Sequence, residues 1–286
     1  MNQIKRAGVI FLLIIINNRL FAQEKASNMN PNSVYPVSEE HKLYKMTVWR
    51  RIDFHEKQNE PFFSQNAEIS KIIIDAVNDG RLVPYESNDS LNRRMTKEAF
   101  MEKLKSQSQE TQPSGTGGTD WGTTGTTADW GAAGGTQGAN ATPAAPAVQY
   151  IFANQLFLYT MREEVFFDDI RSRMYNDIQS LTMVVPAEAS ATNVDQNAGT
   201  FKYKDLEKLF RSMPDQAVWY NRQNTAQNRN MADAFLLRLF SSRVTQISNP
   251  KGQIIEDIYK DPKLSLYMSQ VLEHKLMEYE HDLWEY

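Results

Sequence analysis

Apolar side chains recur at helical spacing in three stretches near the start of the chain. Between residues 39 and 57 they stand three or four positions apart, at Leu43, Tyr44, Met46, Trp49 and Ile52. This period predicts an amphipathic helix. A second helix is predicted over Ile69–Val77, ended by Gly80, and a third one is capped by Thr96 and continues through Leu104. We therefore expect residues 37–105 to form a small, mainly helical N-terminal domain.

Extended patterns begin after residue 148. Residues 148–161 are rich in Tyr, Ile, Phe and Leu without helix or strand breakers, which predicts one or two strands. Residues 181–185 alternate as a buried strand that ends at Pro186. Residues 165–175 fit either a continued strand or the start of a helix.

The end of the chain mixes both patterns. Residues 231–240 predict a helix, and residues 243–247 predict a strand. Asp261 and Pro262 suit the cap and first turn of a long C-terminal helix. The expected fold class is α+β, with a larger mixed α+β C-terminal domain over residues 148–286.

A low-complexity segment, residues 106–147, separates the two predicted domains. Gly, Thr, Ala, Ser, Gln and Pro dominate it, so it offers little apolar area to offset the entropy of ordering. This composition is typical of a flexible Gly/Thr-rich tether. The tether repeats an Asp-Trp-Gly triplet, at Trp121 and again at Trp130, which indicates either a duplicated spacer or a pair of aromatic docking points.

The first residues have the pattern of a secretory signal peptide. Lys5 and Arg6 precede an unbroken apolar run over residues 7–16, and Ala22 suits a cleavage site. No Cys follows the run, so a lipoprotein anchor and direct membrane insertion after cleavage are not expected. Without residues 1–22, 28 basic and 35 acidic residues remain, a net charge of about −7 that argues against nucleic acid and anionic membranes as partners. An exported, acidic, cysteine-free chain fits a bacterial cell envelope.

Signals for catalysis or cofactor binding are weak. The glycines form no phosphate-binding loop, and no nucleophile elbow is present. His274 and His281 flank Glu278 on the predicted last helix, where a solvated charged face is the favoured interpretation over a metal site. The acid pairs Glu163–Glu164 and Asp168–Asp169 are expected at the surface beside a strand. Together with the two-part layout of the chain, they are the basis for the alternative hypothesis, a periplasmic hydrolase of cell-wall glycan.

Aromatic and arginine side chains are the strongest candidates for a binding surface. Such residues concentrate the binding energy of protein interfaces. The candidate partner-binding residues are Trp49, Arg50, Arg51, Trp219, Tyr220, Trp284 and Tyr286. Packing of the last helix onto its own domain is the competing explanation for the two residues at the C-terminus.

Several blocks of sequence resemble the GldN/PorN family of gliding-motility and type IX secretion proteins. The first block is a Trp-Arg-x-Ile-Asp-x-x-Glu-Lys pattern. The blocks are Trp49–Phe63, Val77–Gly80, Val165–Asp168, Phe240–Ser242 and Glu280–Tyr286. Their order and spacing carry the resemblance, which covers roughly residues 37–104 and 150–286. The tether has no obvious counterpart in the family.

The resemblance implies a function without implying catalytic residues. It suggests a non-catalytic, structural subunit of a ring-shaped periplasmic assembly, held at the outer membrane by a lipoprotein of the GldK/PorK type. Inner-membrane motor proteins of the GldL/GldM type are then expected to work against that ring. No cofactor and no metal are implied.

Overall fold

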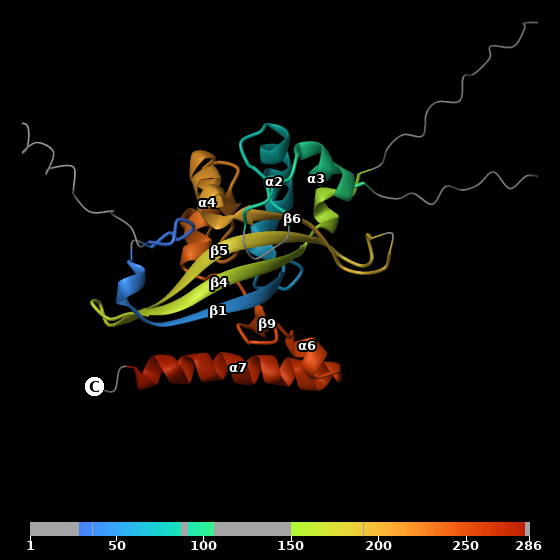
Figure 1. Ribbon diagram of the computed structural model, residues 1–286. Helices are drawn as coiled ribbons and strands as arrows, with labels where there is room; N and C mark the ends of the chain where they lie inside the picture. The colour runs from blue at the N-terminus through green and yellow to red at the C-terminus, as the bar shows by residue number, and fades with distance from the viewer. Residues whose placement is uncertain (1–28, 36, 87–90, 106–149, 191, 284–286) are drawn as a thin grey trace, which may run out of the picture.

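Five antiparallel strands form the sheet around which the described part of the chain is arranged (Figure 1). A computed structural model of the chain describes residues 29–35, 37–86, 91–105, 150–190 and 192–283. The strand order is β6-β5-β4-β1-β9. Their bounds are β1 Lys42–Asp53, β4 Leu158–Asp168, β5 Arg173–Val185, β6 Gln196–Lys202 and β9 Arg243–Ile247. The expected leader over residues 1–22 and tether over residues 106–147 lie outside the described residues.

The helix predicted over residues 39–57 is wrong, because this stretch forms β1. A short 3-10 turn, η2 (Glu39–His41), leads into the strand. Val48, Arg50 and Ile52 are buried at every second position, which is the period of a strand with one face in the core. The sequence pattern concealed this period, because the buried Arg50 was counted as a polar position.

The separate N-terminal helical domain is also not observed. β1 pairs antiparallel with β4 from Lys42 to Asp53 and with β9 from Val48 to Arg51. Residues on both sides of the 106–149 gap therefore share one sheet. The two ends of that gap are themselves adjacent, since Lys105 forms a β-bridge with Tyr150.

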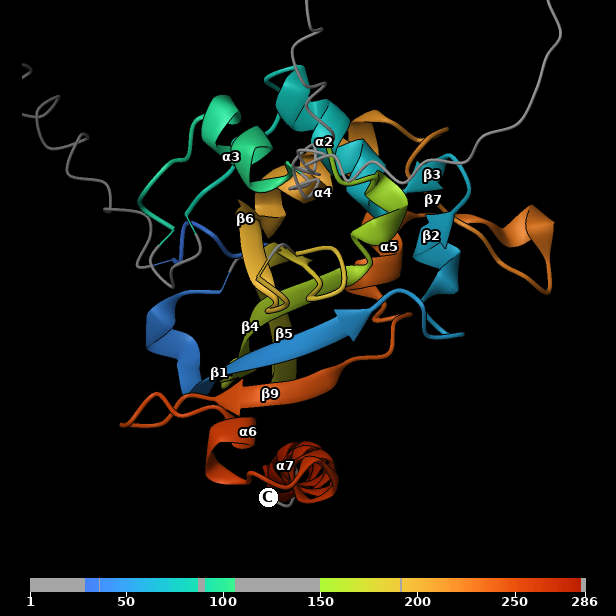
Figure 2. The same cartoon turned by 90° about the vertical axis from the view of Figure 1, so that its right-hand side faces the viewer.

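Four helices lie on the side of the sheet where β6 forms its edge (Figures 1 and 2). They are α2 Ile69–Asn78, α3 Lys97–Lys103, α4 Tyr203–Ser212 and α5 Met231–Leu236. The predictions for α2, α3 and α5 are confirmed in type. Gly80 follows α2 at φ 72°, the left-handed conformation that ends a helix, and the Thr96 hydroxyl accepts the Ala99 amide hydrogen at 3.3 Å.

These helices and the sheet enclose the main core. Phe54 packs edge-on against Tyr159, with ring centroids 5.1 Å apart, and Phe62 packs against Phe235 at 4.9 Å. The Tyr159 hydroxyl is fully buried and lies 2.8 Å from the Ser70 hydroxyl. Its polar atom thus has the partner that a buried hydroxyl requires.

The remaining helices lie beyond the other edge of the sheet (Figure 2). α6 spans Ile255–Ile258, and α7 spans Pro262–Asp282. The long C-terminal helix is confirmed, and the Asp261 carboxylate caps it by accepting the Lys263 amide hydrogen at 3.1 Å. A small second core joins α6 and α7 to the sheet through Val48, Val165, Val244, Ile255 and Leu276.

Short elements complete the described structure. The two-residue strands are β2 Phe63–Ser64, β3 Ala67–Glu68, β7 Val218–Trp219 and β8 Arg229–Asn230. The other 3-10 turns are η3 Glu60–Phe62, η4 Ala153–Gln155 and η5 Thr225–Gln227. The ambiguous stretch over residues 165–175 comprises the end of β4, the hairpin turn and the start of β5, so it continues the strand and does not start a helix. The strand predicted over residues 148–161 begins only at Leu158.

Candidate partner-binding surface

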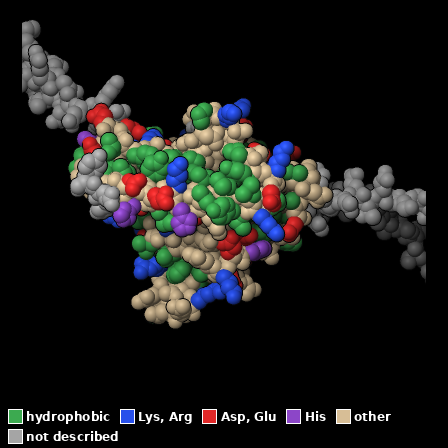
Figure 3. Space-filling view, turned by 90° about the horizontal axis from the view of Figure 1, so that it is seen from below, with side chains coloured by type: hydrophobic (Ala, Val, Ile, Leu, Met, Phe, Trp, Pro, Cys, Tyr) green, Lys and Arg blue, Asp and Glu red, His purple; other side chains and the backbone are tan. Residues whose placement is uncertain are grey.

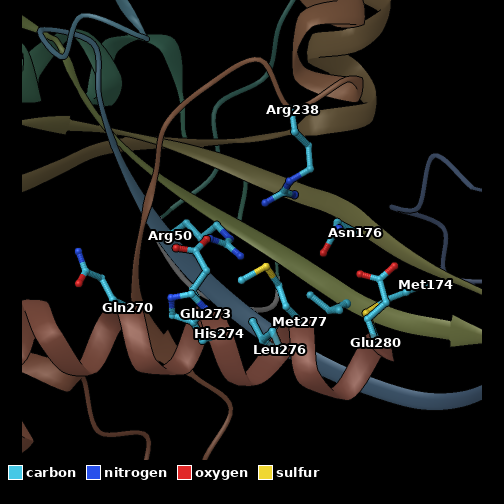
Figure 4. Close-up of a pocket in the computed structure, with 11 residues that line it drawn as sticks. Arg50, Met174, Asn176, Arg238, Gln270, Glu273, His274, Leu276, Met277 and Glu280 are labelled. Atoms are coloured by element: carbon cyan, nitrogen blue, oxygen red, sulfur yellow. The ribbon is translucent and has the colours of Figure 1, made fainter. Parts of the chain in front are cut away.

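A charged network fastens α7 to the sheet. Glu163 on β4 is fully buried and accepts hydrogen bonds from Arg50 Nε at 2.5 Å and from Arg238 Nη1 at 2.7 Å. Arg50 also donates through Nη1 to Glu273 on α7 at 2.7 Å. Figure 4 shows Arg50 and Glu273 pointing toward each other, while Arg238 reaches down from the loop after α5. The Glu163 carboxylate therefore connects β4 with β1, through Arg50, and with the loop after α5, through Arg238. Arg50 extends the network to α7.

The network holds the pKa of Glu163 below its ordinary value. Burial alone would raise that pKa, but the charges and hydrogen bonds of Arg238 and Arg50 outweigh it. Arg238 has φ 54°, a conformation that residues other than glycine rarely adopt. Glu163 is therefore charged in the folded protein and has a structural role. The unfavourable backbone conformation of Arg238 positions one of its two partners.

An open cavity of about 520 Å³ lies between α7 and the sheet (Figure 4). Arg50 and Arg238 line it from the body of the protein, and Glu273, His274 and Glu280 line it from α7. Cations and anions face each other here, so the cavity has no single charge. It separates α7 from the sheet along part of its length.

A second, apolar groove lies on the opposite side of α7. Its volume is about 270 Å³. Met46, Ile247, Ile255, Leu276 and Tyr279 form most of its wall. The groove opens where β9 ends, beside the first half of β1.

The outward surface of α6 and α7 is unusually apolar for an exposed helix pair. Leu264, Leu266 and Tyr267 each expose 43% or more of their surface. Met277 and Ile258 are also exposed, but Met277 lines the cavity between α7 and the sheet and Ile258 lines the apolar groove. Figure 3 shows hydrophobic side chains gathered along this side between scattered charges. Exposed apolar patches of this kind mark interaction sites. The sequence identified the helix, but periodicity alone could not tell which of its apolar positions would stay uncovered.

The three consecutive candidates on β1 point to different faces. Arg50 lies on the side of α7, whereas Trp49 and Arg51 point to the opposite side of the sheet. Trp49 is half-buried, and the guanidinium carbon of Arg162 lies over its ring, 6.0 Å from the ring centroid. Arg51 is paired with Asp195 at 2.6 Å. Helical spacing does not predict these faces, because side chains alternate between the two sides only in a strand.

The other candidates are distant from β1 or outside the described residues. Trp219 packs against the main core on β7, so it is partly a core residue. Tyr220 is 40% exposed, and its amide donates to the Pro61 carbonyl oxygen at 3.3 Å. Trp284 and Tyr286 are not described, so their predicted role in binding stays a prediction. The structure does not bring the described candidates together into one site.

The acid pairs are not the surface residues that the sequence predicted. Glu163, Glu164 and Asp168 are buried, and only Asp169 is exposed. Lys45 lies 3.4 Å from Glu164, and Arg171 lies 2.7 Å from Asp168. Basic partners make such burial possible because an unpaired buried charge is costly.

His274 and His281 are both exposed on α7. Within the described ranges, no three His, Asp or Glu side chains are grouped as metal ligands. None of the helices in the described part of the chain is long and apolar enough to cross a membrane.

Comparison with known proteins identifies the family. A search of curated protein sequences gives no significant match. The family model described as "Gliding motility associated protein GldN" matches residues 37–285, which is most of the chain and includes β1, the sheet and α7. Proteins of this family are components of the gliding-motility and type IX secretion machinery rather than members of an enzyme family. The chain therefore belongs to the family of gliding motility associated protein GldN.

Proposed function

We propose that this chain is a non-catalytic, structural subunit of the periplasmic ring of the type IX secretion and gliding machinery. In that role it binds an outer-membrane lipoprotein of the GldK/PorK type and meets motor proteins of the GldL/GldM type. Membership in the GldN family supports a role in the gliding and secretion machinery, and the predicted signal peptide supports a location in the periplasm. In this proposal the lipoprotein holds the chain at the outer membrane.

The observation that carries the proposal is the exposed apolar surface of α6 and α7. Leu264, Leu266 and Tyr267 of α7 are exposed to water, while the second core holds the helix on the sheet. Covering those side chains releases water from apolar surface, at about 25 cal/mol per Å². A partner protein is the natural cover for such a surface.

The buried acids argue against a glycan hydrolase. A glycosidase needs one carboxyl group with a raised pKa and a second one across an open cleft. Glu163 instead has a lowered pKa and two arginine partners, and Asp168 accepts the backbone amide of Ile170 at 3.1 Å within its own hairpin. Neither acid pair has the environment that this reaction requires.

Co-purification with the lipoprotein tests the proposal. Leu266→Ala with Tyr267→Ala removes two exposed apolar side chains, and we expect it to weaken the complex by tenfold or more, since interface aromatics commonly contribute 2 kcal/mol. The matched control is Gln270→Ala with Glu278→Ala, two exposed polar positions on the same helix. Equal co-purification of both folded double variants would contradict a docking role for α7.

The C-terminal candidates receive a parallel test. Trp284→Ala with Tyr286→Ala is expected to lose the lipoprotein while keeping its circular dichroism spectrum. A variant that unfolds would favour packing of these residues onto their own domain. A folded variant that still co-purifies normally would eliminate them as docking residues.

A further inference from the structure

The first half of β1 has a strand neighbour on only one side among the described residues. β4 pairs with β1 over its whole length, whereas β9 pairs only with Val48–Arg51. The last hydrogen bond of the β9 side is donated by the Ser248 amide to the Thr47 carbonyl oxygen, at 2.8 Å. Backbone groups alternate in direction along a strand. The N–H and C=O groups of Lys45 therefore point to the same side as Thr47, where the described chain supplies no strand.

The chain itself is turned away from this open edge. After β9, the Asn249 side chain closes a tight loop by donating to the Gln253 carbonyl oxygen at 2.8 Å and accepting the Gln253 amide hydrogen at 2.9 Å. Gly252 completes the loop at φ 62°. β9 thus ends at Ile247, and no strand among the described residues continues its row beside residues 43–46.

The apolar groove lies directly along the open row. Met46 and Ile247 line it from the sheet, and Leu272 and Tyr279 line it from α7. Its volume of about 270 Å³ is below the roughly 300–1,000 Å³ of small-molecule pockets. The groove instead suits individual side chains that alternate from an extended backbone.

We propose that the edge of β1 at residues 43–47 binds an extended segment of another protein, which adds a strand after β9 and places alternate apolar side chains in the groove. Backbone groups that have no strand partner in the described part of the chain favour an extended occupant, and the apolar wall favours apolar side chains on one face of it. A register shift at Leu43 and the charge of Lys45 restrict the open edge to a few residues, as in sheets protected from indiscriminate pairing. This inference does not rest on the ring assembly or on the outer surface of α7.

Two variants at one position separate backbone from side-chain effects. Lys45→Pro removes the outward amide hydrogen, and proline is tolerated at strand edges whose N–H is not used. Lys45→Ala keeps that hydrogen and is the matched control, because both variants lose the contacts of Lys45 with Glu39 and Glu164. Thermal unfolding of both variants checks that the sheet is intact.

The probe is a fluorescent ten-residue peptide of alternating Val and Thr, added to the mature protein and followed by anisotropy. We expect Lys45→Pro to bind it at least tenfold more weakly than Lys45→Ala. We also expect the outward-pointing amide of Lys45 to gain protection from hydrogen exchange when the peptide binds, whereas the amides of Tyr44 and Met46, which point toward β4, should change little. Equal affinity of the two variants, or protection elsewhere only, would overturn the proposal.

A modified peptide keeps the test decisive if Lys45→Pro fails to fold. N-methylation of every second amide blocks hydrogen bonding on one edge of the peptide only. We expect one of the two alternating sets to abolish binding to the wild-type protein and the other to have little effect, whereas equal effects would overturn the proposal. Sedimentation of the protein without peptide gives the last outcome. If the wild-type protein forms a dimer that Lys45→Ala leaves intact and Lys45→Pro weakens, the edge binds a second copy of this chain, which would overturn the proposed partner.

Discussion

At the scale of single residues, buried charge shapes this protein more than its overall acidity does. Glu163 is enclosed by β4, β1 and α5, and its charge is compensated by Arg50 and Arg238. Burying such a group is costly unless its partners are also present. The arrangement therefore fixes which strand and which loop must meet at this point.

Removing the charge of Glu163 should be strongly destabilising. Glu163→Gln leaves Arg50 and Arg238 without their shared anion, and we expect a loss of about 3 kcal/mol in the free energy of unfolding, measured by urea denaturation. Glu273→Gln is the control, because Glu273 is 44% exposed and its pair should contribute at most about 1 kcal/mol. Similar losses for both variants would show that Glu163 has no special role.

A second buried acid, Asp177, holds the N-terminal segment on the sheet. Its carboxylate accepts the Val34 amide hydrogen at 3.2 Å and the Gln179 side-chain amide hydrogen at 2.6 Å. Burial raises the pKa of Asp177 to about 6; hydrogen bonds from Ser33 and Val34 and the charge of Lys42 oppose the rise, and nearby Glu164 adds to it. Asp177 is thus a carboxyl group that titrates close to neutral pH.

The raised pKa predicts the sign of a pH effect. The folded state binds the proton of Asp177 more tightly than the unfolded state does. The stabilisation that this protonated carboxyl group gives to the folded state is therefore fully present below about pH 4 and is lost as the pH rises through about 6. Asp177→Asn should remove this decline. We expect the difference in melting temperature between variant and wild type to shift in favour of the variant from pH 4.5 to pH 7.5, whereas a constant difference would contradict the assignment.

At the scale of elements, small residues decide how closely helices approach the sheet. Ser269 lets α7 come close to β9 and donates its hydroxyl to the Val244 carbonyl oxygen at 2.6 Å. Gly199 on β6 does the same for α3, where a Cβ atom would lie only 2.9 Å from Phe100 Cδ2. Phe100 is fully buried and packs edge-on against Phe201, with ring centroids 5.8 Å apart.

Adding that one carbon atom tests the packing of α3. Gly199→Ala should reduce the free energy of unfolding by about 1–3 kcal/mol through overpacking, measured by denaturant unfolding. Phe100→Leu in the same chain should recover part of the loss, because the smaller side chain vacates the contact. Strictly additive effects of the two substitutions would show that they do not meet.

At the scale of the whole molecule, one sheet joins the two parts of the chain that the sequence had separated. β1 comes from residues before the 106–149 gap, and both of its neighbours come from residues after it. The low-complexity segment therefore stays a predicted tether between two parts of one sheet, and not between two independent domains.

Limited proteolysis distinguishes these arrangements. If residues 106–147 are an unpacked tether, a protease should cut there first. The two fragments should separate on a denaturing gel but elute together in gel filtration, because β1 remains between β4 and β9. Fragments that elute apart would contradict the shared sheet, and resistance to cutting would contradict the tether.

The sequence alone determined the features that depend on local chemistry. It located α2, α3 and α7 through their periodicity and caps, and the ordered blocks beginning at Trp49 revealed the family. It failed at β1, because a buried arginine is indistinguishable from an exposed one until its partner is known, and Glu163 lies 113 residues away. Only the tertiary structure decided which charges are buried, which face of α7 stays uncovered and where the edge of β1 is open, since each depends on residues that folding brings together from distant parts of the chain.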